Sequence, residues 1–285
     1  MLSRARVLRI SLPLLAVAVV SACLVVVSRS YVRYDGIVED VSAWGSFFNV
    51  FGVAYAIVAA FLLVTVLNRY SALSQTVEDE LNAVESIRDF LVYFGGDQHA
   101  PAQELRTALA RYTKAVATAE WKEMADPAIT CNSDTSDELY EIMRCAGKIR
   151  VADDRDLSIL SAVITSSSDL AKMRTRRIAL ANERLPPRLR MLLLFMSVAL
   201  PSAFLALGVR SLGAHVFMTV ALSVSVYLIY WVIEDLDHPF YGIWNIDRTP
   251  LDELIKRFES ETSSVPPAPA QQLHGRVVKG IGGRP

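Results

Sequence analysis

Four long runs of apolar residues limit the possible folds of this chain more than any other feature. They contain no charged residue and are Ile10–Val27, Ala43–Leu67, Met191–Val209 and Ala214–Ile233. Each approaches or exceeds the roughly 20 residues that a helix needs to cross a hydrocarbon core about 30 Å thick. The sequence therefore predicts an all-α membrane protein with four transmembrane helices, the last three at about 43–67, 191–209 and 214–233.

The first run has a second interpretation, as a signal peptide. Three arginines precede it, and Val20-Ser21-Ala22-Cys23 resembles a lipoprotein cleavage site. The apolar run nevertheless continues through Val27, whereas a cleaved signal usually ends its apolar stretch at the cleavage site. A retained helix is therefore favoured, and residues 1–42 are assigned to this helix and an external loop.

Lysines and arginines near the ends of the runs predict the orientation. Arginines precede the first run, Arg69 follows the second, and seven lysines and arginines lie between residues 172 and 190. The 28–42 connection has only Arg29 and Arg33, offset by three acidic residues. Both termini and the region between the second and third runs are thus expected in the cytoplasm. Ser211-Leu212-Gly213 should form the tight turn between the last two spans.

The region of about 68–188 reads as a helical bundle inserted between the second and third spans. Apolar residues recur at spacings of three and four from Leu73 to Phe94 with no breaker after Leu67, so the second span should continue as one long helix until Gly95-Gly96. Further apolar stripes include Leu105, Leu109, Tyr112, Val116 and Ala119, and then Leu157, Leu160, Ile164, Ala171 and Ile178. Thr135 and Glu138 have capping-box spacing, and Asp153 or Asp154 can cap the last helix. Residues 259–285 are expected to be a disordered tail.

Several classes of function lack their signatures. The sequence has no phosphate-binding loop, no G-x-G-x-x-G, no H-E-x-x-H and no G-x-S-x-G, so no enzyme activity and no cofactor are predicted. Its 29 basic and 30 acidic residues give no bias toward nucleic acid. Cys131 and Cys145 have no histidine nearby, so a zinc site lacks ligands; they either pair or remain thiols.

The second run has two distinct faces. Phe47, Phe51 and Tyr55 recur every four residues, while Gly52, Ala56 and Ala60 form a row of small residues on another face. In one interpretation the small row packs against other helices and the aromatic stripe lines a hydrophobic constriction in an oligomer. In the other, the aromatic residues face lipid or lie within the helix bundle.

Acidic residues cluster at the inner end of the fourth run. Glu234, Asp235 and Asp237 precede the segment that contains Pro239, Phe240 and Gly242. Their carboxylates could hold a hard cation. They could instead pair with the arginines before the third run, which is favoured because those arginines need counter-charge on the same side of the membrane.

The stretch from Glu234 to Gly242, followed by Pro250-Leu251-Asp252-Glu253-Leu254, resembles the closing motif of a bacterial bestrophin-like membrane domain. Other segments agree in order and are similar to that family. They are Glu80 and Glu85, then Arg106, Tyr112, Glu120 and Trp121, then Arg174, Arg176, Arg177 and Pro186. The resemblance covers about 43–258.

Bestrophins are pentameric anion channels whose second membrane helix lines a hydrophobic neck, and an acidic segment after the fourth helix binds calcium. The resemblance therefore implies a homo-oligomer in the bacterial inner membrane that passes small anions along the second span. Here Ile243-Trp244-Asn245-Ile246 replaces most of that acidic segment, so no metal site is predicted. The rival hypothesis is a non-conducting membrane scaffold whose helical domain recruits partners; an enzyme with a dispersed site is a weaker third. Fold resemblance alone does not decide among them.

Overall fold

The computed structural model describes residues 4–31, 41–95, 98–126, 135–205 and 209–264, and the regular elements within these ranges are all helical. In chain order they are α1 (Arg4–Tyr31), α2 (Val41–Phe90), α3 (His99–Ala115), a π-helical segment (Val116–Glu120), α4 (Trp121–Ala125), α5 (Ser136–Ala146), α6 (Asp154–Asn182), α7 (Pro187–Leu205), α8 (Leu212–Leu236) and α9 (Thr249–Ser264). The predicted all-α class is confirmed. Most of the 28–42 connection and Cys131 lie outside the described residues.

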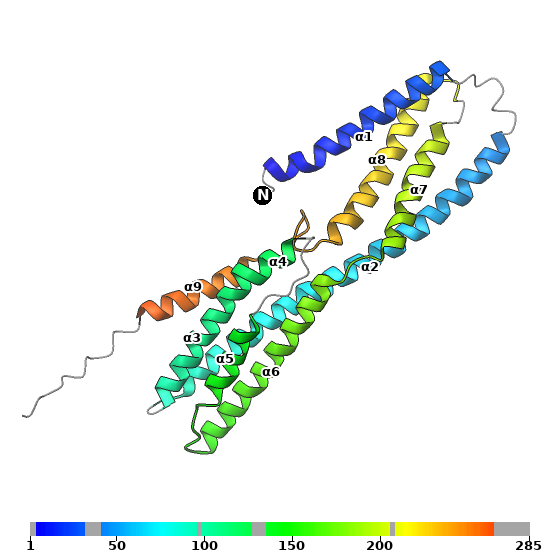
Figure 1. The fold of residues 1–285 in the computed structure, drawn as a ribbon. Helices are drawn as coiled ribbons and strands as arrows, with labels where there is room; N and C mark the ends of the chain where they lie inside the picture. The colour runs from blue at the N-terminus through cyan, green and yellow to red at the C-terminus, as the bar shows by residue number, and fades with distance from the viewer. Residues whose placement is uncertain (1–3, 32–40, 96–97, 127–134, 206–208, 265–285) are drawn as a thin grey trace, which may run out of the picture.

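Four helices are long and apolar enough to cross a membrane, as expected: α1, α2, α7 and α8. They lie together at one end of an elongated molecule (Figure 1). The first half of α2 packs on α7 and α8 through Tyr55, Ala59, Leu62 and Val66, while α1 runs along α8. Ser211 caps α8 by accepting a hydrogen bond from the Ala214 N–H. Gly213 therefore lies inside the helix and not in the turn expected for it.

Helix α2 continues out of the membrane region without a break, as its uninterrupted apolar pattern predicts. It has 50 residues and ends at Phe90, where a short 3₁₀ turn (Leu91–Tyr93) leads to Gly95. At 1.5 Å per residue the helix is about 75 Å long, more than twice the thickness of a hydrocarbon core. One rigid element therefore belongs to both the membrane spans and the bundle beside them.

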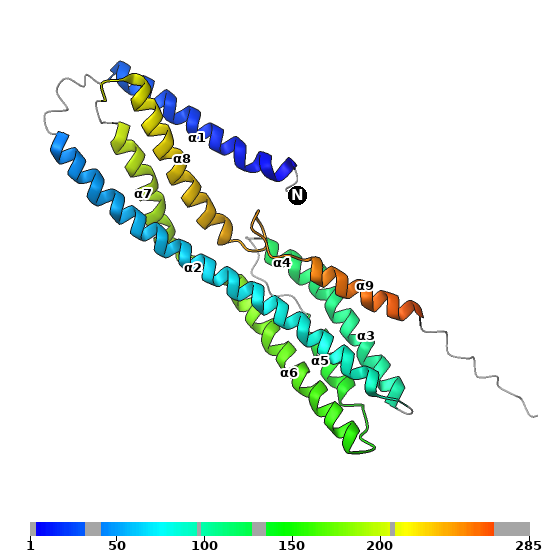
Figure 2. The same cartoon turned by 180° about the vertical axis from the view of Figure 1, so that it is seen from behind.

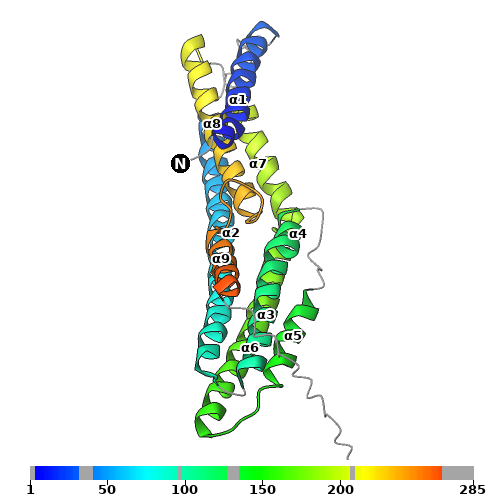
Figure 3. The same ribbon diagram turned by 90° about the vertical axis from the view of Figure 1, so that its left-hand side faces the viewer.

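The second half of α2 forms a helical bundle with α3–α6 and α9 (Figure 3). Its longest contact is with α6, which runs beside α2 toward the membrane spans. Leu73, Val84 and Ile87 of α2 pack with Leu105 and Leu109 of α3, all of which are buried. The buried face of α2 follows the predicted stripe.

Two apolar stripes differ from the prediction. The π-helical segment adds a residue to one helical turn, which rotates the chain so that Ala117 and Glu120 are buried and Ala119 is exposed. In α6, Leu157 and Ile164 are exposed, whereas Arg174 and Arg177 are buried. The buried face of α6 therefore differs from the predicted apolar face, because two of the residues that are in fact buried are arginines.

The helix ends also bear on the expectations. Asp153 caps α6 by accepting a hydrogen bond from the Asp156 N–H at 2.7 Å, as predicted. Thr135 precedes α5 but makes no side-chain capping bond, because its hydroxyl turns toward Glu120. Helix α9 reaches Ser264, so the start of the tail predicted at 259 was too early; residues 265–285 lie outside the described residues.

Candidate functional site

The predicted aromatic stripe on α2 does not form one exposed face. The Phe47 ring is 45 % exposed and stacks on Phe51 with ring centroids 5.4 Å apart. Tyr55 is only 4 % exposed, and its hydroxyl donates a hydrogen bond to the Val226 carbonyl of α8 at 3.3 Å. The stripe therefore starts at the surface of the molecule and ends between α2 and α8.

A different face of α2 is left uncovered. Its large apolar residues are more than half exposed, and they are Val50, Val53, Ile57, Phe61 and Val64. Ala56 and Ala60 of the small row are exposed with them, so they are not covered by the helices of this chain that the structure describes. Figure 2 shows α2 in front along its whole length, with no other helix across its membrane half.

The acidic end of α8 is a second feature, and Asp237 is its centre. Its carboxylate is fully buried and forms ion pairs with Arg69 of α2 and, at 2.8 Å, with Arg190 of α7. It also accepts a hydrogen bond from the Leu185 backbone N–H at 3.0 Å, and the Asp237 carbonyl accepts one from Arg184 at 2.5 Å. One side chain thus ties together α2, α8 and the α6–α7 connection by the arginine pairing that the sequence favoured.

The other acidic residues have separate roles. Glu234 approaches Arg190 at 3.3 Å on the partly exposed side of the cluster. The Asp235 carboxylate accepts hydrogen bonds from the backbone N–H groups of Ile243 and Trp244 at 2.9–3.1 Å, so the arginine pairing expected for it is wrong. A Cβ atom on Gly242 would lie 2.5 Å from that carboxylate, which explains the glycine.

The rest of the closing motif fastens this segment to the bundle. The Pro239 carbonyl accepts a hydrogen bond from the Ile246 N–H at 2.9 Å, which closes the turn after α8. The buried ring of Phe240 meets Trp121 of α4 edge to face, with centroids 5.1 Å apart. Across the described ranges, no group of three or more His, Cys, Asp or Glu side chains could hold a metal ion.

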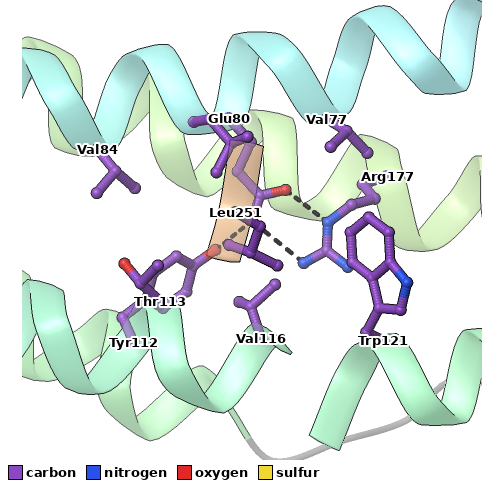
Figure 4. A pocket seen from close by; sticks show the side chains of 10 residues that line it. Val77, Glu80, Val84, Tyr112, Thr113, Val116, Trp121, Arg177 and Leu251 are labelled. Carbon is purple, nitrogen blue, oxygen red and sulfur yellow. Dashed lines mark hydrogen bonds and ion pairs between the residues drawn. The ribbon is translucent and has the colours of Figure 1, made fainter. Parts of the chain in front are cut away.

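A third feature is a network of buried charges in the bundle, which periodicity did not predict. Arg177 of α6 binds Glu80 of α2 at 2.5 Å through Nε and also pairs with Glu120. Tyr112 of α3 donates a hydrogen bond to Glu80 at 2.6 Å (Figure 4). Arg174 contacts Glu120 at 2.6 Å, so two arginines balance two carboxylates inside the bundle.

Two residues of the buried charge network, Glu120 and Thr135, are placed by the local geometry of the backbone. The π-helical segment turns Glu120 inward, where it is fully buried. The Thr135 hydroxyl donates to Glu120 and accepts from Arg174 at 2.7 Å. A cavity of about 10 Å³ beside Glu80, Tyr112 and Arg177 has room for about one water molecule. Glu80, Glu120, Arg174 and Arg177 belong to the segments quoted for the family resemblance, which was the one signal that singled out these charged residues.

Burial and charge act together on the titrating groups of this network. Burial, and then the Glu80 carboxylate, raise the pKa of Tyr112 well above its usual value. Burial alone would lower the pKa of Arg177, but Glu80 and Glu120 outweigh it and the pKa is raised. The network therefore holds its arginine charged and its tyrosine neutral.

Comparison with known proteins agrees with this architecture. The chain matches the Bestrophin-like domain over residues 14–251, which is most of its length and includes part of α1. The chain belongs to the bestrophin-like family. No curated protein matches this bestrophin-like chain.

Solved structures show the same fold at low sequence identity. The crystal structure of a point variant of a bacterial bestrophin homolog from Klebsiella pneumoniae has 15 % identity and a TM-score of 0.71, and the match covers 86 % of this chain and 98 % of that one. A structure of the bacterial bestrophin homolog from Klebsiella pneumoniae phased with zinc has 16 % identity and a TM-score of 0.70, and the match covers 88 % and 99 %. The bestrophin-like fold thus extends over nearly the whole chain.

Proposed function

We propose that this protein assembles around an axis as an ion channel that passes small anions, with α2 lining the path. The observation that carries the proposal is the uncovered apolar face of α2 in a chain of the bestrophin-like family. The proposed assembly is a pentamer in the bacterial inner membrane, with the bundle and both termini in the cytoplasm. The resemblance to bestrophins supports the pentamer, and the arginines at the ends of the spans support the orientation.

The packing within the protomer supports this choice of helix. One face of α2 is covered by α7 and α8, and the opposite face carries Val50, Ile57 and Phe61, which are 65–71 % exposed. Ala56 and Ala60 on the uncovered side would let neighbouring copies approach closely. No charged residue lies on α2 between Trp44 and Asn68. A path lined by this face would be a hydrophobic constriction.

Such a constriction has predictable physical properties. Apolar rings offer no hydrogen bonds, so a narrow ring tends to dewet and to stop ions. Aromatic ring edges carry partial positive charge, which favours anions slightly over cations. Phe47 and Phe51 are candidates for the outer part of the path and Phe61 for its inner part. Tyr55, which lies against α8, would then hold the helix in place behind the lining.

Anion flux into liposomes tests the proposal with a matched pair of variants. Phe61 in α2 and Phe195 in α7 have the same exposed fraction, 65 %, so both face outward from the protomer. Phe61→Ala should widen the constriction and raise chloride flux several-fold at equal incorporation, and Phe51→Ala should act in the same direction. Phe195→Ala, on a helix that faces lipid in this proposal, should leave the flux of the wild-type protein unchanged.

Two outcomes would contradict the proposal. If Phe195→Ala raises flux and Phe61→Ala does not, α2 does not line the path. If wild type, Phe51→Ala and Phe61→Ala all stay at the protein-free background, the protein does not conduct, and the scaffold hypothesis replaces the channel.

A further inference from the structure

A cluster of arginines surrounds the inner end of the spans, where α2 leaves the membrane region, α7 enters it and α8 ends. Arg69, Arg184 and Arg190 all contact Asp237, which places them at one level along the molecule. Arg188 lies on the first turn of α7, two residues before Arg190. This level coincides with the edge of the apolar windows of α7 and α8, where the headgroups of a bilayer must lie.

The part of the chain that the structure describes supplies too few carboxylates for these arginines. Asp237 pairs with Arg69 and Arg190, and Glu234 pairs with Arg190. Arg184 reaches only the backbone carbonyl of Asp237, through one nitrogen. Among the described residues, no side chain forms an ion pair with Arg184 or Arg188. Most of the N–H donors of these two guanidinium groups are therefore available to another acceptor.

The surroundings of Arg184 agree with a deficit of negative charge. Half-burial lowers the pKa of Arg184, Asp237 opposes this, and the neighbouring charges of Arg69 and Arg190 lower it further. An added anion would relieve that repulsion. Nearby carboxylates do not fill this role: Asp235 is bonded to backbone N–H groups, and Glu183 is exposed and makes no ion pair in the part of the chain that is described.

We infer that Arg184 and Arg188 bind the phosphate group of an anionic phospholipid in the membrane leaflet nearest the bundle. Guanidinium groups match the geometry of phosphate oxygens and bind them bidentately. Basic sites between membrane helices at the headgroup level bind anionic lipids in this way. The source of the phosphate is a lipid because Arg184 lies just before a membrane span and Arg188 lies on its first turn.

Asp237 is a positioning residue for this site. It accepts the Leu185 N–H at 3.0 Å and, through its carbonyl, holds Arg184. The Asp237 carboxylate also pairs with Arg190, which lies in the first turns of α7, whereas Arg184 precedes that helix. The connection that carries Arg184 is thereby held against α8, and the proposed lipid site is built on a fixed backbone.

The test measures the thermal melting of delipidated protein in detergent. Phosphatidylglycerol should raise the melting temperature more than phosphatidylcholine does, and this difference should shrink at high salt because the contact is electrostatic. Arg188→Gln changes an exposed residue that forms no ion pair in the described part of the chain. It should weaken phosphatidylglycerol binding about fivefold and so reduce the difference in melting temperature between the two lipids, and the Arg184→Gln, Arg188→Gln double variant should abolish that difference. Arg176→Gln, at an exposed arginine of α6 farther from the spans, is the matched control and should behave as wild type.

Each alternative outcome decides the question. The inference is wrong if Arg188→Gln keeps the full difference between the lipids, or if Arg176→Gln loses as much of it. It is also wrong about the source if inorganic phosphate alone reproduces the whole rise in melting temperature. Because Arg188 is exposed and forms no ion pair with a described residue, its variant remains decisive even if the double variant fails to fold.

Discussion

The two halves of α2 bury their inner faces in opposite ways. In the membrane half the buried residues, Ala59, Leu62 and Val66, are apolar, and so are the residues exposed on the opposite face. In the bundle half, Glu80 is buried among apolar neighbours and is bound by Arg177 and Tyr112. The membrane half is therefore held by the shape of its packed apolar side chains, whereas the bundle half also depends on paired charges that accept few alternative arrangements.

This difference predicts a large loss of stability when a charge is removed from the bundle. Arg177→Met leaves the buried Glu80 without its arginine and Glu120 with Arg174 alone, and should cost about 3–5 kcal/mol of unfolding free energy or abolish folding. Arg176→Met, at the exposed neighbour, should change stability by no more than about 0.5 kcal/mol. Circular dichroism during thermal unfolding in detergent measures both. Equal effects would mean that the buried network adds nothing particular to the bundle.

The junction between the two halves should be intermediate. Asp237→Asn keeps an acceptor for the Leu185 N–H but removes the charge that pairs with Arg69 and Arg190, and should cost about 2 kcal/mol because Arg190 is partly exposed. The melting temperature should fall equally with and without divalent cations. A calcium-dependent rise in the wild type that Asp237→Asn removes would show a metal role in place of this structural one.

Two tyrosines, one in each half of α2's surroundings, give the most direct comparison, and the smallest expected loss of stability is that of Tyr55→Phe. Tyr112→Phe removes a hydrogen bond to a buried carboxylate and should cost about 1.5–3 kcal/mol. Tyr55→Phe removes a 3.3 Å hydrogen bond to a carbonyl within the spans and should cost about 0.6 kcal/mol. Melting temperatures of the two variants in the same detergent measure the ratio, and a larger loss for Tyr55→Phe would reverse the comparison.

The pH dependence of Tyr112 sharpens the same test. Because burial and Glu80 raise its pKa in the folded protein, neutral Tyr112 contributes stability that is complete below its usual pKa near 10 and is lost as the pH rises through the raised value. Stability should therefore fall more steeply with pH above about 10 in the wild type than in Tyr112→Phe. If the stability of both proteins falls with the same slope, a group other than Tyr112 causes the loss of stability at alkaline pH.

The same contrast explains what sequence patterns could predict. The spans and the length of α2 followed from apolar runs without a breaker, because those features depend on local chemistry alone. The role of Tyr55 did not follow, because every face of a membrane helix is apolar and periodicity cannot separate the packed face from the exposed one. The buried face of α6 was predicted wrongly because Arg174 and Arg177 look like surface residues in the sequence. Their burial becomes understandable only when the fold brings Glu80 and Glu120 beside them.

The site at the end of α8 was partly predictable. Arginines and carboxylates at the same membrane surface must compensate one another, which was enough to favour arginine partners for Asp237. The role of Asp235 depended on a turn whose backbone N–H groups point at the carboxylate, and spacing carries no information about that. The inward turn of Glu120 likewise required one extra residue in a helical turn, which α-helical periodicity does not anticipate.

Because α2 is continuous, a movement at one of its ends is transmitted to the other. Arg69, which pairs with Asp237, lies about 42 Å from the Val41 end of the helix and about 32 Å from the Phe90 end, taking 1.5 Å per residue. A tilt of about 5° around that contact would move the Val41 end by about 4 Å and the Phe90 end by about 3 Å in the opposite direction. A small displacement of the end in the bundle would therefore appear, slightly enlarged and reversed, at the far end of the membrane half.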